Sequence, residues 1–299
     1  MHIREQHDSV DVERQFCVNP DTSMKEELKR IWQICFGDEL EYIDLYFEYR
    51  FRPEEMLVYL IDGHPVSMLS LLPAKLYYGG KMQPLRYVYG VGTLPEHRGR
   101  GYARILLEEG RRRTGEPLAL VPASDSLREY YGKLGFAPVF SLAEYHIEPE
   151  EITACGSERN GQEYWLLTVT PGEYYRIREA AFAADGYVSW DEDAIAYALR
   201  ENDFVGGYAY KVQHHGREDI LMMRQEEQAL HILETTLSPA DVTAVMKRLR
   251  INCPVLVRGA VDRISAEAAS DGDGYAVRDY GMLWGGPEFC GGYVNLTLE

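Results

Sequence analysis

Two glycines and two arginines lie in a short bend between an apolar stretch and a predicted helix, in the segment VGTLPEHRGRGYA at residues 91–103. Glycine lets the backbone approach a ligand closely and adopt a positive φ. The amide N–H groups at a helix N-terminus have no partner inside the helix, and the helix dipole adds positive potential there. The bend therefore predicts an anion site built from main chain, sized for a pyrophosphate. Arg98 and Arg100 can add charge-assisted hydrogen bonds.

Two better-known phosphate-binding motifs do not fit this sequence. A P-loop requires G-x-x-x-x-G-K-[ST], but the Gly80–Lys81 pair is followed by Met82. The dinucleotide fingerprint G-x-G-x-x-G fails because Pro95 stands where its third glycine belongs. Taken alone, an R-G-x-G segment fits an exposed basic turn as well as it fits an anion site.

A second motif, YYGKLGF at residues 130–136, follows at the end of another predicted helix. Together the two segments resemble the GCN5-related N-acetyltransferase (GNAT) superfamily. The phosphate loop of that superfamily, [QR]-x-x-G-x-[GA], is matched by Arg98, Gly101 and Ala103. Its later signature, [FY]-Y-x-x-x-G-F, is matched by Tyr130, Tyr131, Gly135 and Phe136. The resemblance extends over about residues 24–148 in the order and spacing of its elements.

The resemblance implies that the chain binds acetyl-CoA in a V-shaped opening between two central parallel strands. It assigns the thioester and pantetheine contacts to the backbone N–H groups of Val91 and Thr93, with Gly92 leaving room between them. Donors aimed at a developing oxyanion are among the largest catalytic contributions. It assigns the pyrophosphate to the amides of Arg98, Gly99, Arg100, Gly101, Tyr102 and Ala103. Ser126 is a further candidate for a cofactor contact, with a helix N-cap as its alternative role.

Tyr131 matches the tyrosine that protonates the departing thiolate in this superfamily. A phenol with a pKa of ~10 can donate to a thiolate whose conjugate acid has a pKa of ~8.5 when the two are held in contact. The resemblance also implies that the acetyl group passes directly to an amine in a ternary complex, so no cysteine nucleophile is required. The alternative for Tyr131 is a core tyrosine, and Tyr130 is expected to pack or to line the cofactor.

The general base is not identified by the sequence. Glu96 and His97 flank the loop, and His64 lies in a predicted turn, but each of these side chains can equally face water. Three acidic residues near the first predicted helices either attract a cationic amine or form a solvated face: Glu39, Glu41 and Asp44.

Apolar periodicity predicts the elements that position these motifs. A first helix is predicted to end at Gly37. It is predicted from four apolar residues at helical spacing: Leu28, Ile31, Trp32 and Cys35. Strands are predicted at 56–61, 66–78, 87–93, 118–121 and 139–147, and a helix at 101–113. Serine followed three residues later by glutamate predicts capping boxes at Ser126 and Ser189, and Ser238 is predicted to cap a helix that begins with Pro239.

The same order of elements occurs again in the second half, with strands predicted at 207–212, 220–224, 229–237, 253–257 and 293–298. The second copy lacks the Gly-Arg insert. This arrangement resembles the first two domains of the Eis (enhanced intracellular survival) group of acetyltransferases. That group usually carries a third, sterol-carrier-like domain, for which this chain is too short. In that group the terminal carboxylate enters the active site, which nominates Glu299. Two unrelated α+β halves are the alternative.

We therefore expect an α+β protein of tandem GNAT-like domains, each a mixed, centrally split β-sheet flanked by helices. Only the first domain is expected to be chemically active. The predicted organisation is an N-terminal arm at 1–20, a catalytic domain at 21–150, a linker at 151–163 and a degenerate GNAT-like domain at 164–299.

The composition is typical of a soluble globular protein, with 299 residues of which 45% are hydrophobic and 26% are charged. The net charge of −17 disfavours a nucleic-acid partner, and the apolar runs are too short to span a membrane. The first sixteen residues are charged throughout, so no signal peptide is expected. The 5 cysteines include no C-x-x-C pair, which predicts neither a disulfide framework nor a metal site and fits the reducing cytoplasm.

The leading interpretation is an acetyl-CoA-dependent N-acetyltransferase acting on the amine of a small molecule or a peptide, and the acidic charge suits a cationic acceptor. A non-catalytic module that senses acyl-CoA or binds a partner is the first alternative. An acyltransferase that uses a longer acyl chain or an oxygen acceptor is the second. The sequence leaves the acceptor and a homo-oligomeric state open.

Overall fold

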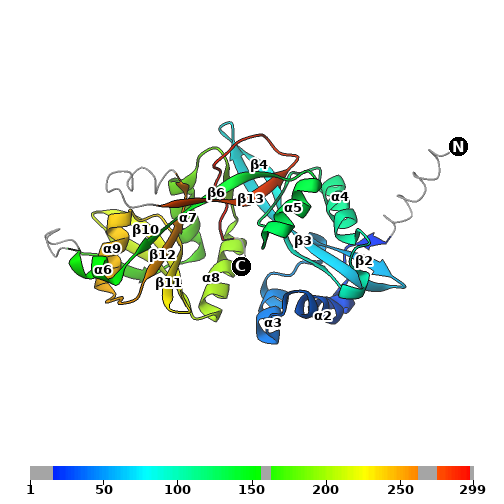
Figure 1. Ribbon diagram of the computed structural model, residues 1–299, viewed down its shortest axis with the longest axis horizontal. Helices are drawn as coiled ribbons and strands as arrows, with labels where there is room; N and C mark the ends of the chain where they lie inside the picture. The colour runs from blue at the N-terminus through cyan, green and yellow to red at the C-terminus, as the bar shows by residue number, and fades with distance from the viewer. Residues whose placement is uncertain (1–15, 156–162, 262–274, 297–299) are drawn as a thin grey trace. The chain divides into compact units, whose positions relative to one another are not determined.

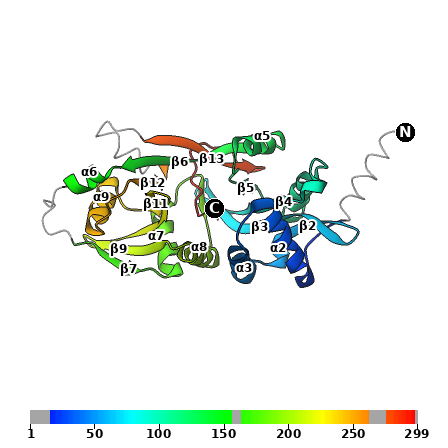
Figure 2. The same ribbon diagram turned by 60° about the horizontal axis from the view of Figure 1, so that its bottom comes forward.

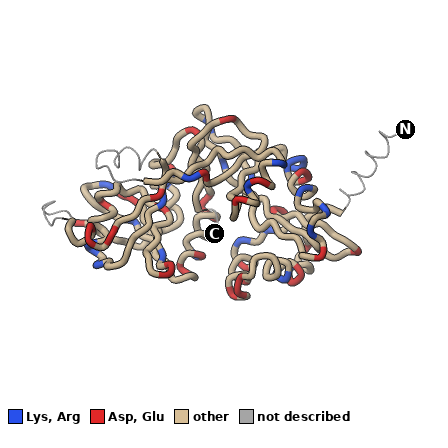
Figure 3. Tube along the Cα trace, viewed as in Figure 1, with Lys and Arg blue, Asp and Glu red and all other residues tan. Residues whose placement is uncertain are grey.

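The computed structural model describes residues 16–155, 163–261 and 275–296, which form two compact units (Figure 1). The first unit combines Met1–Ala74, Pro84–Ala137 and Leu283–Gly286. The second combines Lys75–Gln83, Pro138–Met282 and Pro287–Glu299. Acidic and basic residues are interspersed along the trace of both units (Figure 3). Among the described residues, no helix is long and apolar enough to cross a membrane.

The first unit is a mixed sheet with helices packed against it. Its strand order is β1-β2-β3-β4-β5-β13, where β13 contributes only its end. The strands are β1 (Cys17–Val18), β2 (Met56–Ile61), β3 (His64–Tyr78), β4 (Lys81–Thr93), β5 (Leu118–Leu120) and β13 (Ala276–Trp284). The helices are α2 (Lys25–Phe36), α3 (Leu40–Tyr49), α4 (Tyr102–Thr114) and α5 (Asp125–Lys133), with short 3₁₀ turns at Thr22–Met24, Pro53–Glu55 and Pro95–His97.

The apolar periodicity of the first unit explains its core. Leu28, Ile31 and Trp32 lie on one face of α2 and are buried, as their helical spacing predicts. The helix ends at Gly37, which adopts the left-handed conformation that a C-cap favours. Strands β2 and β3 are almost continuously buried because helices or strands cover both of their faces. The expected α+β class, with a mixed sheet flanked by helices, is confirmed.

In the second unit the mixed sheet has the strand order β13-β6-β12-β11-β10-β9-β7 (Figure 2). Its strands are β6 (Ala137–Ile147), β7 (Trp165–Thr168), β8 (Tyr187–Ser189), β9 (Tyr208–His214), β10 (Arg217–Glu226), β11 (Ala229–Thr235) and β12 (Val255–Gly259). Its helices are α6 (Pro149–Ala154), α7 (Pro171–Phe182), α8 (Glu192–Phe204) and α9 (Pro239–Arg248). The short strand β8 pairs with Lys75–Tyr77 at the end of β3.

The two units share one motif, a strand followed by a helix and a second, parallel strand. In the first unit β4 and β5 are the parallel pair on either side of α4. In the second unit β11 and β12 are the parallel pair on either side of α9. Ser238 caps α9 and Pro239 is its first residue, as the sequence predicts. The strand, helix and parallel strand around α4 and around α9 therefore occupy equivalent topological positions in the two units.

The structure corrects the expected limits of several segments. Cys17 and Val18 of the expected N-terminal arm pair with β2. The first part of the expected linker is the helix α6, where Ile152 is buried in the core of the second unit, and residues 156–162 lie outside the described residues. The units also differ from the expected domains because β13, which the sequence does not predict, places Leu283–Gly286 in the first unit.

Two of the predicted caps are displaced along the chain. Ser124 rather than Ser126 caps α5, with its hydroxyl accepting the Leu127 N–H at 3.3 Å. Asp191 rather than Ser189 caps α8, because Ser189 is still part of β8. In both cases two cap-forming residue types stand close together, and backbone geometry selects one. The predicted strand at 293–298 is reduced to an isolated bridge between Tyr187 and Tyr293, and residues 297–299 lie outside the described residues.

Candidate active site

The strand that leads into the loop, β4, changes its hydrogen-bonding direction at Gly90. In the middle of β4 the Arg86 N–H donates to the Pro117 carbonyl on the β5 side, at 2.9 Å. Just after β4 the Leu94 N–H donates to the Val66 carbonyl on the β3 side, at 3.0 Å. Residues an even number apart in a regular strand point the same way. The direction therefore reverses in between, and Gly90, with a φ of 61°, is the bulge that reverses it.

This reversal turns the N–H groups of Val91 and Thr93 away from β3 and toward the β5 side. On that side the described pairing of β4 with β5 is limited to Arg86 with Leu118 and Tyr87 with Ala119. The rest of β4 extends beyond the end of this short ladder. The two amides therefore point to the side of β4 that lies beyond its described pairing with β5.

The loop after β4 presents a row of free amides. Among the described residues, none of the N–H groups from Gly99 to Ala103 donates to another protein group. Gly99 and Gly101 have positive φ values, and α4 begins after Gly101 without a side-chain cap. The Arg98 amide, which the sequence places among these donors, instead donates to the Pro95 carbonyl at 3.2 Å. The row of free amides therefore runs from Gly99 to Ala103.

The two arginine side chains of the loop also bond to main chain. Arg98 Nε donates to the Thr93 carbonyl at 3.0 Å, so this side chain lies across the end of β4. Arg100 Nη2 is 3.5 Å from the Glu96 carbonyl. Both side chains are exposed, and their other N–H groups remain available to an anion.

Two residues to which the sequence assigns no role in the site contact the end of β4. The fully buried Ser67 hydroxyl donates to the Gly92 carbonyl at 3.0 Å and lies 2.8 Å from the Thr93 hydroxyl. Cys35 Sγ lies 3.4 Å from the Thr93 carbonyl. A Cβ at Gly92 would lie 3.3 Å from Cys35 Sγ, so the absence of a side chain there lets α2 pack closely on β4.

Tyr131, the expected acid, is buried at the end of α5. Its ring packs edge-on against Phe136 and Tyr130, with centroids 5.6 and 5.3 Å away. Among the described residues its hydroxyl has no hydrogen-bond partner. Burial raises the pKa of Tyr131 well above its ordinary value, and the neighbouring Tyr130 adds to this. The phenol is therefore held protonated, as a proton donor must be.

The turn after α5 depends on a residue from the far end of the sequence. Gly135 has a φ of 99°, and a Cβ there would lie 3.1 Å from the Trp284 Nε1 atom of β13. The indole also packs against Phe136, with centroids 5.5 Å apart, and the Arg111 guanidinium of α4 lies 4.6 Å from its centre. Trp284 therefore contacts both α4 and the Y-Y-x-x-x-G-F signature.

The remaining candidates are placed less centrally. Tyr130 interacts electrostatically with Arg104 and Glu108 of α4, so it lies beside that helix. Ser126 is exposed in the first turn of α5, with its hydroxyl 3.0 Å from that of Ser124.

Of the candidate bases and amine-attracting acids, His97 stands apart, because among the described residues its buried Nδ1 atom has no hydrogen-bond partner. His64 is exposed and bonds to Glu27 at 3.0 Å, and Asp44 pairs with Lys29 at 2.7 Å. Three of the nominated acids are exposed, namely Glu39, Glu41 and Glu96. Glu299 lies outside the described residues. No group of three or more His, Cys, Asp or Glu among the described residues is arranged to hold a metal ion.

Comparisons with known proteins agree with this geometry. Residues 20–139 match the family model of the acetyltransferase (GNAT) domain. No sequence among the curated proteins matches the chain. Among solved structures, a GCN5-related N-acetyltransferase from Anabaena variabilis has a TM-score of 0.73 at 18% identity, over 89% of this chain and 71% of that chain.

Two further solved structures are similar over about the same share of this chain. An Enterococcus faecalis protein described as a probable N-acyltransferase has a TM-score of 0.69 at 15% identity, over 89% of this chain and 71% of its own. Eis1 from Mycobacterium abscessus has a TM-score of 0.64 at 15% identity, over 90% of this chain and 73% of its own. At such identities the likeness shows the fold. The chain thus has the fold of the GCN5-related N-acetyltransferases, and its residues 20–139 match their acetyltransferase domain.

Proposed function

We propose that the chain is an acetyl-CoA-dependent N-acetyltransferase that passes the acetyl group directly to an amine in a ternary complex. One observation carries the proposal: the free amides of Gly99–Ala103 lie in the loop after β4, whose last N–H groups point beyond its described pairing with β5. A row of free amides at a helix N-terminus suits a pyrophosphate. The N–H groups of Val91 and Thr93 suit the carbonyl and pantetheine of an acyl thioester.

In the proposed reaction the amine nitrogen attacks the thioester carbonyl carbon, and the N–H donors stabilise the negative charge that develops on its oxygen. When the tetrahedral intermediate collapses, the C–S bond breaks and the Tyr131 hydroxyl gives its proton to the departing thiolate. Tyr131 recovers a proton from the surrounding water. The amine loses its proton to a base that the described residues do not single out.

The acceptor is proposed to be the amine of a small molecule or a peptide. The net charge of −17 favours the approach of a cationic acceptor. The second unit, which has no counterpart of the Gly-Arg loop, is proposed to be a degenerate GNAT-like domain in a tandem arrangement of the Eis kind.

Thermal unfolding of the full chain with and without acetyl-CoA tests the proposal, followed by CoA release across a panel of amines. A raised melting temperature and amine-dependent release of CoA support it. No shift at saturating acetyl-CoA would remove it. Binding without turnover on any amine would favour a module that only senses acyl-CoA, and product mass spectrometry separates acetylation from transfer of a longer chain.

Replacing Ser67 with alanine is expected to lower kcat while leaving the KM for acetyl-CoA nearly unchanged. The Ser67 hydroxyl holds the Gly92 carbonyl, and the next N–H along the chain, that of Thr93, is a proposed oxyanion donor. Losing one such donor costs roughly 100-fold in kcat, so a partial misalignment should cost about tenfold. Acetyl-CoA affinity should hold because the loop amides are untouched.

Ser70→Ala is the matched control for this change. Ser70 is also buried on β3, and its hydroxyl lies 2.8 Å from that of Tyr46. Both variants should lose similar stability, about 1 kcal/mol for one buried hydrogen bond. Equal kcat values for the two variants would show that Ser67 is merely structural.

A further inference from the structure

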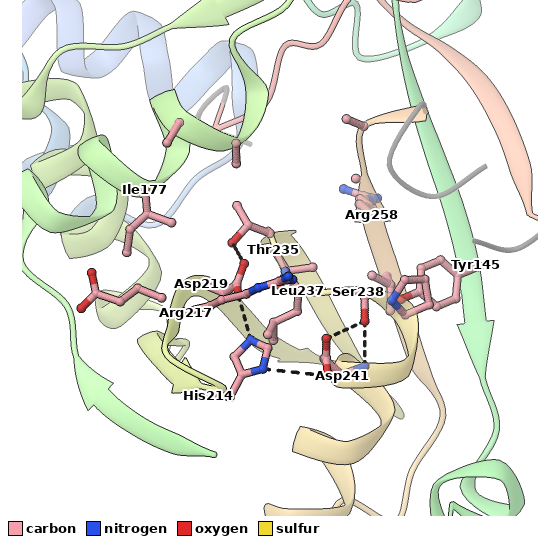
Figure 4. A pocket seen from close by; sticks show the side chains of 18 of the residues that line it. Tyr145, Ile177, His214, Arg217, Asp219, Thr235, Leu237, Ser238, Asp241 and Arg258 are labelled. Carbon is pink, nitrogen blue, oxygen red and sulfur yellow. Dashed lines mark hydrogen bonds and ion pairs between the residues drawn. The ribbon is translucent and has the colours of Figure 1, made fainter. Parts of the chain in front are cut away.

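The second unit contains a cavity of about 660 Å³ at the carboxyl ends of its parallel strands β11 and β12 (Figure 4). Helices α7 and α9 form two of its walls. This is the topological position that the candidate acyl-CoA site occupies in the first unit. The proposed reaction makes no use of the cavity.

The polar groups of this cavity are unlike those of the phosphate loop. Ser238 accepts the Asp241 N–H at 3.2 Å, and Pro239 has no N–H to offer. The Asp241 carboxylate also stands in the first turn of α9. A helix end that is capped and carries a carboxylate disfavours an anion. The cavity therefore retains the position of the first site without its affinity for phosphate.

Carboxylates and a histidine from three different elements line one side of the cavity, as Figure 4 shows. Asp219 accepts hydrogen bonds from His214 Nε2 at 2.8 Å and from the Thr236 hydroxyl at 2.6 Å. Asp241 accepts from the Tyr164 hydroxyl at 2.7 Å. These hydrogen bonds hold both carboxylates in place. They offset part of the free-energy cost of removing the two carboxylates from bulk water.

The His214 ring is the least satisfied member of this group. Its side chain is 4% exposed, and its ring stacks on Tyr164 with centroids 5.1 Å apart. Among the described residues its Nδ1 atom has no hydrogen-bond partner and lies 4.0 Å from the nearest Asp241 oxygen. Buried polar atoms without a partner are uncommon in native proteins, and here the atom belongs to a residue that lines a cavity.

A cation lies beside Asp219 on β10 (Figure 4). Arg217 lines the cavity, is exposed, and has no ion-pair partner among the described residues. The other two arginines of the lining are paired, Arg176 with Glu218 and Arg258 with Glu144. Arg217 and Asp219 alternate on β10 and so share one face of the strand, with their backbones about 7 Å apart.

We propose that this cavity binds a small zwitterion, with its ammonium group on Asp219 and Asp241 and its carboxylate on Arg217. The proposal concerns the second unit alone and does not rest on the proposed acetyltransferase activity.

Isothermal titration of the full chain with three matched probes tests the proposal: γ-aminobutyrate, n-butylamine and butyrate. The first carries both charges, and each of the others lacks one. We expect γ-aminobutyrate to bind at least about tenfold more tightly than either half-molecule, because each lost charge-assisted bond is worth roughly 1.5–3 kcal/mol. No binding of γ-aminobutyrate at millimolar concentration overturns the proposal, and so does equal binding of the amine alone.

Substitutions of the cavity residues test whether γ-aminobutyrate binds in this cavity. Arg217→Ala and Asp219→Asn should each weaken γ-aminobutyrate binding by about tenfold or more. Arg248→Ala and Asp203→Asn are matched controls at exposed positions outside the cavity lining, and should leave binding unchanged. Undiminished binding to both cavity variants overturns the proposal. The same variants are also titrated with acetyl-CoA. Loss of γ-aminobutyrate binding in the second unit can then be distinguished from loss of acetyl-CoA binding in the first unit.

Discussion

Replacing Gly101 with glutamate should abolish the stabilisation of the chain by acetyl-CoA. A ligand at 100 times its Kd stabilises the folded state by about 2.7 kcal/mol, a shift of several degrees in Tm. The glutamate would place a negative charge among the free amides of Gly99–Ala103, where the proposed pyrophosphate binds. The fold should survive because a Cβ at Gly101 meets nothing within 4 Å. Differential scanning fluorimetry measures the outcome, and acetyl transfer should fall below detection.

Gly115→Glu is the matched control for this change. Gly115 caps the other end of α4 and has a φ of 67°, and a Cβ added there likewise meets nothing within 4 Å. Both variants therefore introduce the same backbone strain and the same charge. The Gly115 variant should keep the full acetyl-CoA shift. A normal shift in the Gly101 variant would contradict a cofactor site at the start of α4.

Replacing Tyr131 with phenylalanine should lower kcat roughly 100-fold, the lower end of the range for a general acid. The KM for acetyl-CoA should change little, because the hydroxyl acts only when the thiolate departs. The loss of stability should be small, since the hydroxyl has no hydrogen-bond partner among the described residues. Steady-state kinetics with a thiol-reactive dye measures the rate of CoA release.

Tyr130→Phe is the control, because it removes a hydroxyl from the neighbouring residue of the same helix. The pH profile gives a second readout. Tyr131 must be protonated to act, and burial raises its pKa well above the ordinary value. The wild-type rate should therefore not fall as the pH rises through about 10, where an ordinary tyrosine ionises. A Tyr131→Phe enzyme as fast as the wild type would assign the residue to packing.

The loop could be predicted from the sequence because its signals are local. Gly99 and Gly101 need positive φ, and a glycine-rich bend between an apolar strand and a helix marks such a position. The same local signals misplaced two caps, since neighbouring residues such as Ser124 and Ser126 have similar propensities. Only the φ and ψ angles of the folded backbone separate them.

The residues that hold the site in place could not be predicted from the sequence, because their roles depend on contacts between distant segments. Ser67 stands in the apolar run SMLSLL, and only its bond to Gly92, 25 residues away, gives it a role. Trp284 lies in a strand that the sequence does not predict, and its contacts with Gly135 and Arg111 follow from the order of the sheet. The carboxylates and the histidine that line the cavity of the second unit likewise come together only through tertiary structure.

The position of β13 has a consequence for biosynthesis. Leu283–Gly286 belong to the first unit, whose other described residues precede Pro138. During translation the ribosome completes α5 long before it delivers Trp284. Until then β5 lacks its β13 neighbour, and an open strand edge invites pairing with other chains. A nascent chain released before residue 283 should therefore be prone to aggregation, and the first unit should mature only late in synthesis.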